Sequence, residues 1–161
     1  MSCYQVTIID SPLHSSKDSF DRVSDEDVIF LYESFREKAK LPRHYGLKKR
    51  VIDAITRRIL NPEYRKWTIH DVAQDIGTTK RTLQRRLKGQ KASFSALYDE
   101  VRRYYAVHYL LEQHLTVNDI SYALGFSNRT GLLSAFKRWL GISPTALKRL
   151  KKEAVRKKNN M

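Results

Sequence analysis

An internal repeat constrains the fold of this chain more than any other feature. The segment TIHDVAQDIGTT at 68–79 aligns with TVNDISYALGFS at 116–127 at an offset of 48 residues. Beyond the turn the offset becomes 49, because the second copy carries one extra residue where its next helix begins. Solenoids of stacked helical hairpins normally need three or more copies, so two copies favour a different arrangement. The matched pairs include Thr68 and Thr116, Asp71 and Asp119, Gly77 and Gly125, Leu83 and Leu132, and Leu87 and Phe136.

Each copy has the pattern of a helix-turn-helix unit. Thr68 and Thr116 stand at predicted N-caps, each with an Asp three residues later. Gly77 and Gly125 supply turns in which a positive φ is usually wanted. A second helix follows each turn. In the helix-turn-helix layout that second helix enters the DNA major groove.

The second helix of the first copy, at 79–89, carries side chains suited to DNA. Leu83 and Leu87 face the core, and polar and basic side chains occupy the opposite face. Arginine can bond guanine O6 and N7, glutamine can bond adenine N6 and N7, and lysine suits phosphates. A solvated basic face is the alternative interpretation. The candidate DNA-binding residues are Thr79, Lys80, Arg81, Gln84, Arg85 and Lys88.

The second copy presents a less basic face. Leu132 and Phe136 point inward, and Ser134 stands where the first copy has Arg85. We therefore expect weaker base reading here, through a thymine-methyl contact from Leu133 and through DNA shape and backbone contacts. The candidate residues are Asn128, Arg129, Thr130, Leu133, Ser134 and Lys137.

A long helix is predicted between the copies, over 94–112. At roughly 1.5 Å per residue it would be about 28 Å long, and successive major grooves on one side of DNA lie about 34 Å apart. One monomer could therefore hold two readers on an asymmetric site. An apolar stripe runs along the helix and includes His108, which we expect in the core. The stripe consists of Phe94, Leu97, Val101, Tyr104, His108 and Leu111.

Charge divides the chain near Gly46. The net charge is +14 for all 161 residues, −2 for residues 1–46 and +16 for the remainder. We expect three parts: a short acidic extension at 1–46, a DNA-binding domain at 47–150, and a basic C-terminal tail at 151–161.

The extension at 1–46 contains a weak strand signal at 3–10 and an amphipathic helix that starts at Ser24, with Asp27 completing the cap. The helix is either a packing cap for the DNA-binding domain or, through residues 24–40, a contact for a protein partner or a second copy. Its apolar stripe consists of Val28, Leu31, Tyr32 and Phe35.

Several classes of protein are excluded. Cys3 is the single cysteine, which rules out an internal disulfide and a cysteine-cluster metal site. The five histidines lack zinc-site spacing, and catalytic and nucleotide-binding motifs are absent. No apolar run has the length of a membrane span, and the N-terminus lacks a signal-peptide layout. We expect no catalytic residue, cofactor or metal, and a cytoplasmic location at the nucleoid.

Three segments resemble the AraC/XylS family of bacterial transcription regulators. They are TTKRTLQRRLKG at 78–89, SFSALYDEVRRYYAVHYL at 93–110, and DISYALGFSNRTGLLSAFKRWLGISPTALKR at 119–149. The resemblance covers residues 47–150. It implies an all-α fold of two helix-turn-helix subdomains joined by a long linker helix.

The resemblance also implies promoter binding and recruitment of RNA polymerase. The family's base-contacting positions fall on six residues: Arg81, Gln84, Arg85, Thr130, Leu133 and Ser134. The chain departs from the family pattern at Arg129, Leu132 and Ser134, and 46 residues cannot hold the usual effector domain. A stand-alone reader or a fragment of a longer regulator is expected.

The leading hypothesis is a sequence-specific regulator of transcription, an activator that binds promoter DNA as a monomer. One alternative is an architectural protein that uses its charge on phosphates without sequence preference. Another is an interaction protein that acts through its N-terminal helix.

Overall fold

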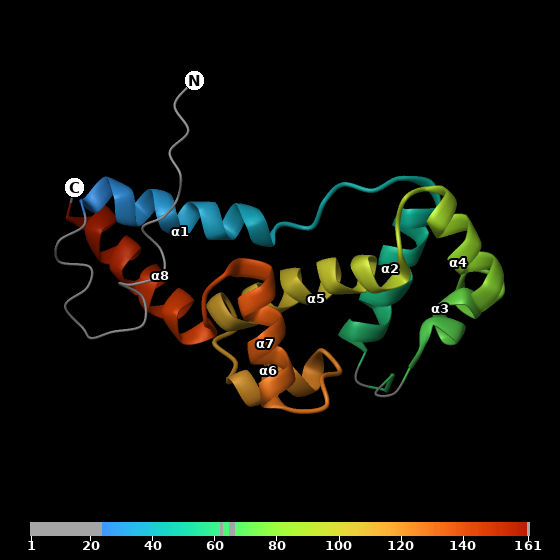
Figure 1. Ribbon diagram of the computed structural model, residues 1–161. Helices are drawn as coiled ribbons and strands as arrows, with labels where there is room; N and C mark the ends of the chain where they lie inside the picture. The colour runs from blue at the N-terminus through green and yellow to red at the C-terminus, as the bar shows by residue number, and fades with distance from the viewer. Residues whose placement is uncertain (1–23, 62, 65–66, 161) are drawn as a thin grey trace, which may run out of the picture.

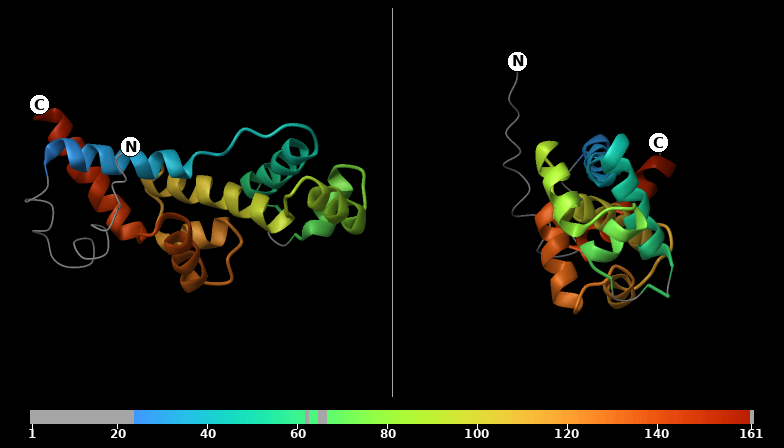
Figure 2. Two further views of the ribbon diagram at one scale, coloured as in Figure 1. Left: turned by 45° about the horizontal axis from the view of Figure 1, so that its top comes forward. Right: turned by 90° about the vertical axis from the view of Figure 1, so that its right-hand side faces the viewer.

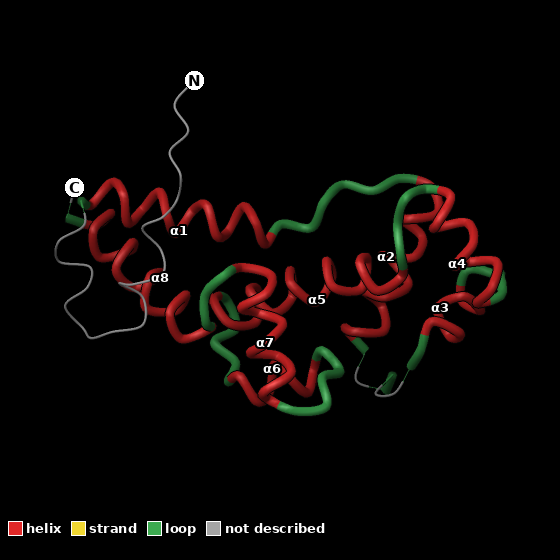
Figure 3. The backbone as a smooth tube through the Cα atoms, in the orientation of Figure 1, coloured by secondary structure: helices red, strands yellow, loops and turns green. Residues whose placement is uncertain are grey.

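The computed structural model describes residues 24–61, 63–64 and 67–160. These residues form eight helices and no strand, which confirms the predicted all-α class (Figures 1 and 3). The predicted strand at 3–10 and Cys3 lie outside the described residues. No helix in the described part is both long and apolar enough to cross a membrane. The helices are α1 (Asp25–Ala39), α2 (Gly46–Leu60), α3 (Ile69–Asp75), α4 (Lys80–Gly89), α5 (Phe94–Leu111), α6 (Val117–Ala123), α7 (Arg129–Leu140) and α8 (Pro144–Asn159).

The long helix α5 joins two groups of helices. At one end it carries α2, α3 and α4, and at the other α6, α7, α8 and α1 (Figure 1). Ser93 caps its start, because the Ser93 hydroxyl accepts from the backbone N–H of Ala96 at 3.1 Å. The predicted linker helix is therefore confirmed, and it ends one residue earlier than expected.

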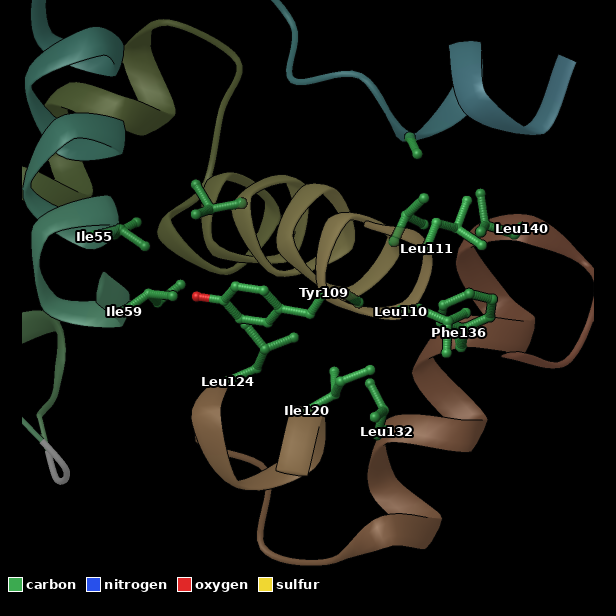
Figure 4. Close-up of a cluster of buried hydrophobic side chains, with 14 of the residues drawn as sticks. Ile55, Ile59, Tyr109, Leu110, Leu111, Ile120, Leu124, Leu132, Phe136 and Leu140 are labelled. Carbon is green, nitrogen blue, oxygen red and sulfur yellow. The ribbon is translucent and has the colours of Figure 1, made fainter. Parts of the chain in front are cut away.

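A continuous apolar core runs along α5 and connects both groups. Figure 4 shows Ile55 and Ile59 of α2 on one side of α5, and Leu132 and Phe136 of α7 on the other. Tyr109 of α5 points toward α2. The two helix-turn-helix units thus share one core, which holds them in a defined relation to each other.

The N-terminal helix α1 packs onto α8 and onto the C-terminal part of α5. Ser24 caps it as predicted, with its hydroxyl oxygen 3.1 Å from the N–H of Asp27. Three residues of the predicted stripe, Val28, Tyr32 and Phe35, are buried inside this chain. That stripe is consequently covered by the protein's own helices, which favours the packing-cap interpretation.

Helix α8 continues past the expected start of a basic tail at residue 151. Ser143 caps it and Pro144 occupies its first turn, as the sequence predicts. Ala154 and Lys157 are buried, and the Lys157 ammonium bonds the Asp25 carboxylate at the start of α1. The segment is therefore held against α1 by packing and charge.

The buried side of α5 differs from the predicted stripe. Leu97 and Val101 are buried as expected, but Tyr104 is 36% exposed and His108 only partly buried. The prediction that His108 lies in the core is therefore wrong. The reason is that α5 contacts α1, α2, α6, α7 and α8 along its length, so its buried surface winds around the helix and leaves part of the stripe exposed.

Candidate nucleic-acid interface

The first helix of each helix-turn-helix unit begins with the same hydrogen-bonded cap. The Thr68 N–H donates to Asp71 Oδ2 at 2.7 Å, and the Thr68 hydroxyl oxygen accepts from the His70 N–H at 3.2 Å. In the second unit the Thr116 N–H donates to Asp119 Oδ2, and the Asp119 N–H donates back to Thr116 Oγ1, both at 3.2 Å. The predicted N-caps and capping boxes are confirmed.

The cap of α3 makes stability depend on pH. Hydrogen bonds from the Thr68 backbone N–H and hydroxyl hold the pKa of Asp71 below its ordinary value. A depressed folded-state pKa stabilises the fold above the unfolded-state pKa, which is about 3.9 for Asp. This contribution is lost as the pH falls through that value and then through the lower folded-state pKa. We expect the free energy of unfolding of Asp71→Asn to fall less than that of the wild type between pH 6 and pH 3. Urea titrations of both proteins at each pH measure this difference. The same dependence on pH in both proteins would contradict the prediction.

Both turns contain the predicted left-handed glycine. The φ angle is +70° at Gly77 and +69° at Gly125. After Gly77, Thr79 caps α4, since its hydroxyl oxygen accepts from the Thr82 N–H at 3.2 Å. After Gly125, Asn128 caps α7. The direction in which each second helix leaves its turn is therefore set locally.

An arginine from the preceding long helix also holds each turn. Arg50 of α2 donates to the Ile76 carbonyl at 2.7 Å. Arg102 of α5 donates to the Leu124 carbonyl at 3.0 Å and to the Gly125 carbonyl at 3.1 Å. The sequence did not reveal either arginine. Arg50 and Arg102 do not stand at matching positions of the repeat, and each bonds a carbonyl more than twenty residues away.

The two turn glycines differ in the space around them. A Cβ at Gly125 would lie 3.2 Å from the Tyr98 hydroxyl oxygen, whereas a Cβ at Gly77 would meet nothing within 4 Å. The left-handed conformation alone costs a residue with a Cβ about 1–2 kcal/mol. The Tyr98 hydroxyl also donates to the Leu124 carbonyl at 3.3 Å, and losing such a bond costs about 0.5–1.5 kcal/mol more.

We therefore expect Gly125→Ala to destabilise the protein more than Gly77→Ala. Urea titration of the two variants measures the difference in the free energy of unfolding. Equal losses of the free energy of unfolding would show that the Tyr98 side chain moves aside without an energetic penalty.

Helix α4 turns its basic face to solvent. Leu83 and Leu87 are fully buried, as predicted. The six candidate residues of this unit are all exposed: Thr79, Lys80, Arg81, Gln84, Arg85 and Lys88. Among the described residues none of the four basic ones, Lys80, Arg81, Arg85 and Lys88, has an acidic partner. Their charge is consequently available to an anionic ligand.

Helix α7 presents a more neutral face. Leu132 and Phe136 are buried, as predicted, and Leu133 is half-buried. The other candidates are exposed: Asn128, Arg129, Thr130, Ser134 and Lys137. Arg138, on the same helix, is engaged by Asp99 of α5 at 2.8 Å. The weaker base reading expected of the second unit stays a prediction.

The two second helices lie on the same side of the molecule. Figure 2, right, views the structure along α5 and shows α4 and α7 at the same edge, while α2 and α8 lie toward the other. A single surface therefore carries one exposed, partly basic helix at each end of α5. Within the described residues no group of three or more His, Cys, Asp or Glu could hold a metal ion.

Comparison with known proteins agrees with this geometry. A family model described as "Helix-turn-helix domain" matches residues 72–150. The "Uncharacterized HTH-type transcriptional regulator Rv1395" of Mycobacterium tuberculosis is 40% identical over 82 residues, which is 51% of this chain and 24% of that protein. The "Urease operon transcriptional activator" of Escherichia coli is 35% identical over 92 residues, 57% of this chain and 31% of that protein.

A longer match links the chain to the "Virulence regulon transcriptional activator VirF" of Shigella flexneri, with 25% identity over 122 residues, 76% of this chain and 43% of that protein. The crystal structure of a "DNA-binding transcriptional dual regulator" from Escherichia coli K-12 has the same fold, with a TM-score of 0.58 and 18% identity. It covers 72% of this chain and 99% of that one.

Residues 72–150 form an AraC/XylS-type double helix-turn-helix domain. Domains of this type bind DNA, and their family consists of transcription regulators, not enzymes. The chain spans 24% to 43% of the length of the three curated relatives named above. In this AraC/XylS-type domain, α3 and α4 form the first unit, α6 and α7 the second, and α5 the linker helix.

Proposed function

We propose that this chain is a sequence-specific transcription regulator that inserts α4 and α7 into successive major grooves of a promoter. The observation that carries the proposal is the placement of both helices on one side of the molecule, at the two ends of α5 (Figure 2). The shared core and the arginine-held turns support a defined spacing between the two readers.

In this proposal α4 makes more of the base contacts than α7. Arg81, Gln84 and Arg85 of α4 read base edges, and Lys80 and Lys88 bind phosphates, with the start of α4 at Thr79 close to the backbone. Helix α7 contributes less base reading. It uses Arg129, Thr130 and Leu133, with Asn128, Ser134 and Lys137 near the backbone.

Activation is the proposed mode of regulation, through contact with RNA polymerase in the cytoplasm. Two of the relatives named above are activators by name, and this supports the direction of the effect. Transcription with purified RNA polymerase, from a template that carries the selected site, tests the proposal. A rise in transcript with added protein is expected, and a fall would show that the chain represses.

Selection of bound sequences from a random DNA pool tests the sequence preference. Enrichment of an asymmetric motif with two parts about one helical turn apart is the expected result. Failure to enrich any motif, together with a steep fall in affinity with salt, would favour a non-specific architectural protein instead.

Replacement of Arg81 tests the assignment of α4 as the first reader. We expect Arg81→Ala to cost about 1–3 kcal/mol at one base position and to relax the preference there. Arg86→Ala is the matched control, because it removes the same charge from an exposed position of the same helix. Equal losses for both variants on specific and random DNA would show that Arg81 contributes charge alone.

A further inference from the structure

A row of aromatic and cation–π contacts runs across α5 from the first helix-turn-helix unit to the second. The ring centroids of Trp67 and Tyr98 lie 4.8 Å apart, and the Arg102 guanidinium lies 3.7 Å from the Tyr98 ring centroid. The same guanidinium lies 4.3 Å from the ring centroid of Phe126, which is 6.1 Å from the ring centroid of Trp139. We call this row the aromatic bridge, and its members are Trp67, Tyr98, Arg102, Phe126 and Trp139.

The two ends of the aromatic bridge belong to the elements that aim the reading helices. Trp67 directly precedes Thr68, the N-cap of α3. Phe126 follows Gly125 in the second turn, and Trp139 lies in α7 itself. The bridge therefore joins the start of the first unit to the turn and the reading helix of the second unit.

The centre of the bridge is fixed by hydrogen bonds. Arg102 Nε and Nη2 donate to the carbonyls of Leu124 and Gly125, and the Tyr98 hydroxyl donates to the Leu124 carbonyl. A planar guanidinium can donate hydrogen bonds in its plane while its faces stack on aromatic rings. These side chains of α5 thus hold the second turn, and through Tyr98 they also contact Trp67 of the first unit.

The first reading helix is connected to α5 less directly than the second. Helix α7 packs on α5, whereas α4 packs on α3, α3 on α2, and α2 on α5 (Figure 1). Residues 90–93 join the end of α4 to the start of α5. A second contact at the start of α3 stops the first unit from pivoting about this connection, and the contact between Trp67 and Tyr98 lies there.

We propose that the aromatic bridge fixes the orientation of the first unit relative to the second, and that Trp67 and Arg102 are positioning residues that restrict the DNA site to one spacing between its halves. The inference rests on the proposed function, in which α4 and α7 enter successive major grooves. Each added base pair rotates one half-site relative to the other by about one tenth of a turn. A first unit held in one orientation cannot follow that rotation. Neither positioning residue lies in α4 or α7, so replacing it removes no proposed DNA contact.

Distances between spin labels test the proposal without DNA. Labels are attached at Arg86→Cys in α4 and Lys137→Cys in α7, both exposed positions, in a chain whose native thiol is removed by Cys3→Ser. Double electron–electron resonance then gives the distribution of distances between the two reading helices. We expect Trp67→Ala to broaden this distribution about twofold, because the first unit then populates further orientations. Arg102→Met, which interrupts the bridge at its centre, should also broaden it, whereas Trp67→Phe keeps a ring and should preserve the wild-type width.

Two controls separate orientation from general effects on the fold. Tyr64→Ala removes a ring from the same connection between α2 and α3, where the Tyr64 ring contacts Arg58 outside the bridge. Phe35→Ala removes a buried side chain from α1, which is not part of the bridge. Both should keep the wild-type width at a temperature where circular dichroism shows each variant folded. A wild-type width for Trp67→Ala, or equal broadening by Tyr64→Ala, would overturn the proposal.

DNA titration tests the link between the bridge and the spacing of the site. Each protein is titrated with the selected two-part site and with versions that carry one base pair more or one fewer between the halves. The wild type should bind both altered sites about tenfold more weakly, whereas Trp67→Ala should lose less than about threefold, because its first unit can turn to follow the shifted half. The same spacing preference in both proteins would contradict the positioning role. If selection yields no two-part site, the proposed function fails, while the label distances still show whether the bridge holds the first unit.

Discussion

Phe35→Ala in α1 is expected to reduce the free energy of unfolding by about 3–5 kcal/mol, the usual cost of removing a buried phenylalanine ring. The Phe35 side chain is 1% exposed and lies in the core where α1 packs against its neighbours. The loss should be large because rigid helices on several sides leave a cavity that can collapse only in part. Urea or thermal unfolding followed by circular dichroism measures it.

The same helix provides the control for this prediction. Phe30 is 73% exposed, so Phe30→Ala should change stability by less than about 0.5 kcal/mol. Comparable losses for both variants would mean that α1 does not dock as described. A large loss for Phe35→Ala alone would establish α1 as part of the folded domain, and removal of α1 would then expose the core side chains that it covers.

The second prediction with a large expected effect concerns two adjacent leucines of α7. Leu132 is 1% exposed, whereas Leu133 is half-buried on the outer face. We expect Leu132→Ala to destabilise the protein by about 2–5 kcal/mol. Leu133→Ala should have a much smaller effect on stability and should instead weaken binding to the selected DNA site, by removing the proposed thymine contact.

Denaturant unfolding and DNA titration, applied to both variants, separate these effects. The decisive comparison is made at a temperature where both variants are folded. If Leu133→Ala destabilises as much as Leu132→Ala, the assignment of the two faces of α7 is wrong. If Leu133→Ala leaves DNA affinity unchanged, the helix contacts DNA through other residues.

Much of the first and second units could be predicted from the sequence because their signals are local. A threonine followed by Asp71 or Asp119 predicts a capped start, and Gly77 and Gly125 predict turns with positive φ; all are present in the structure. The helical period of 3.6 residues likewise predicts that Leu83 and Phe136 face the core, and both are buried. Each of these features depends on residues within one or two helical turns.

Other features could not be predicted because they depend on which helices meet. Arg102 bonds a turn 22 residues away, and nothing in its local sequence marks that partner. His108 follows the periodicity of a core position, yet it is only partly buried in the structure. Likewise, no local pattern in α1 indicates that α8 packs against its apolar stripe, the contact that favours the packing-cap interpretation over a partner contact.

The sequence by itself therefore determined the helices, their caps, the duplicated unit and the faces of the two second helices, since these follow from backbone hydrogen bonding and helical periodicity over short spans. Only the tertiary structure decided that α1 packs onto α8 and that the two units share one core. These depend on contacts between residues far apart in the chain, such as Asp25 with Lys157 and Arg58 with Asp75. A pattern within one helix carries no information about such partners.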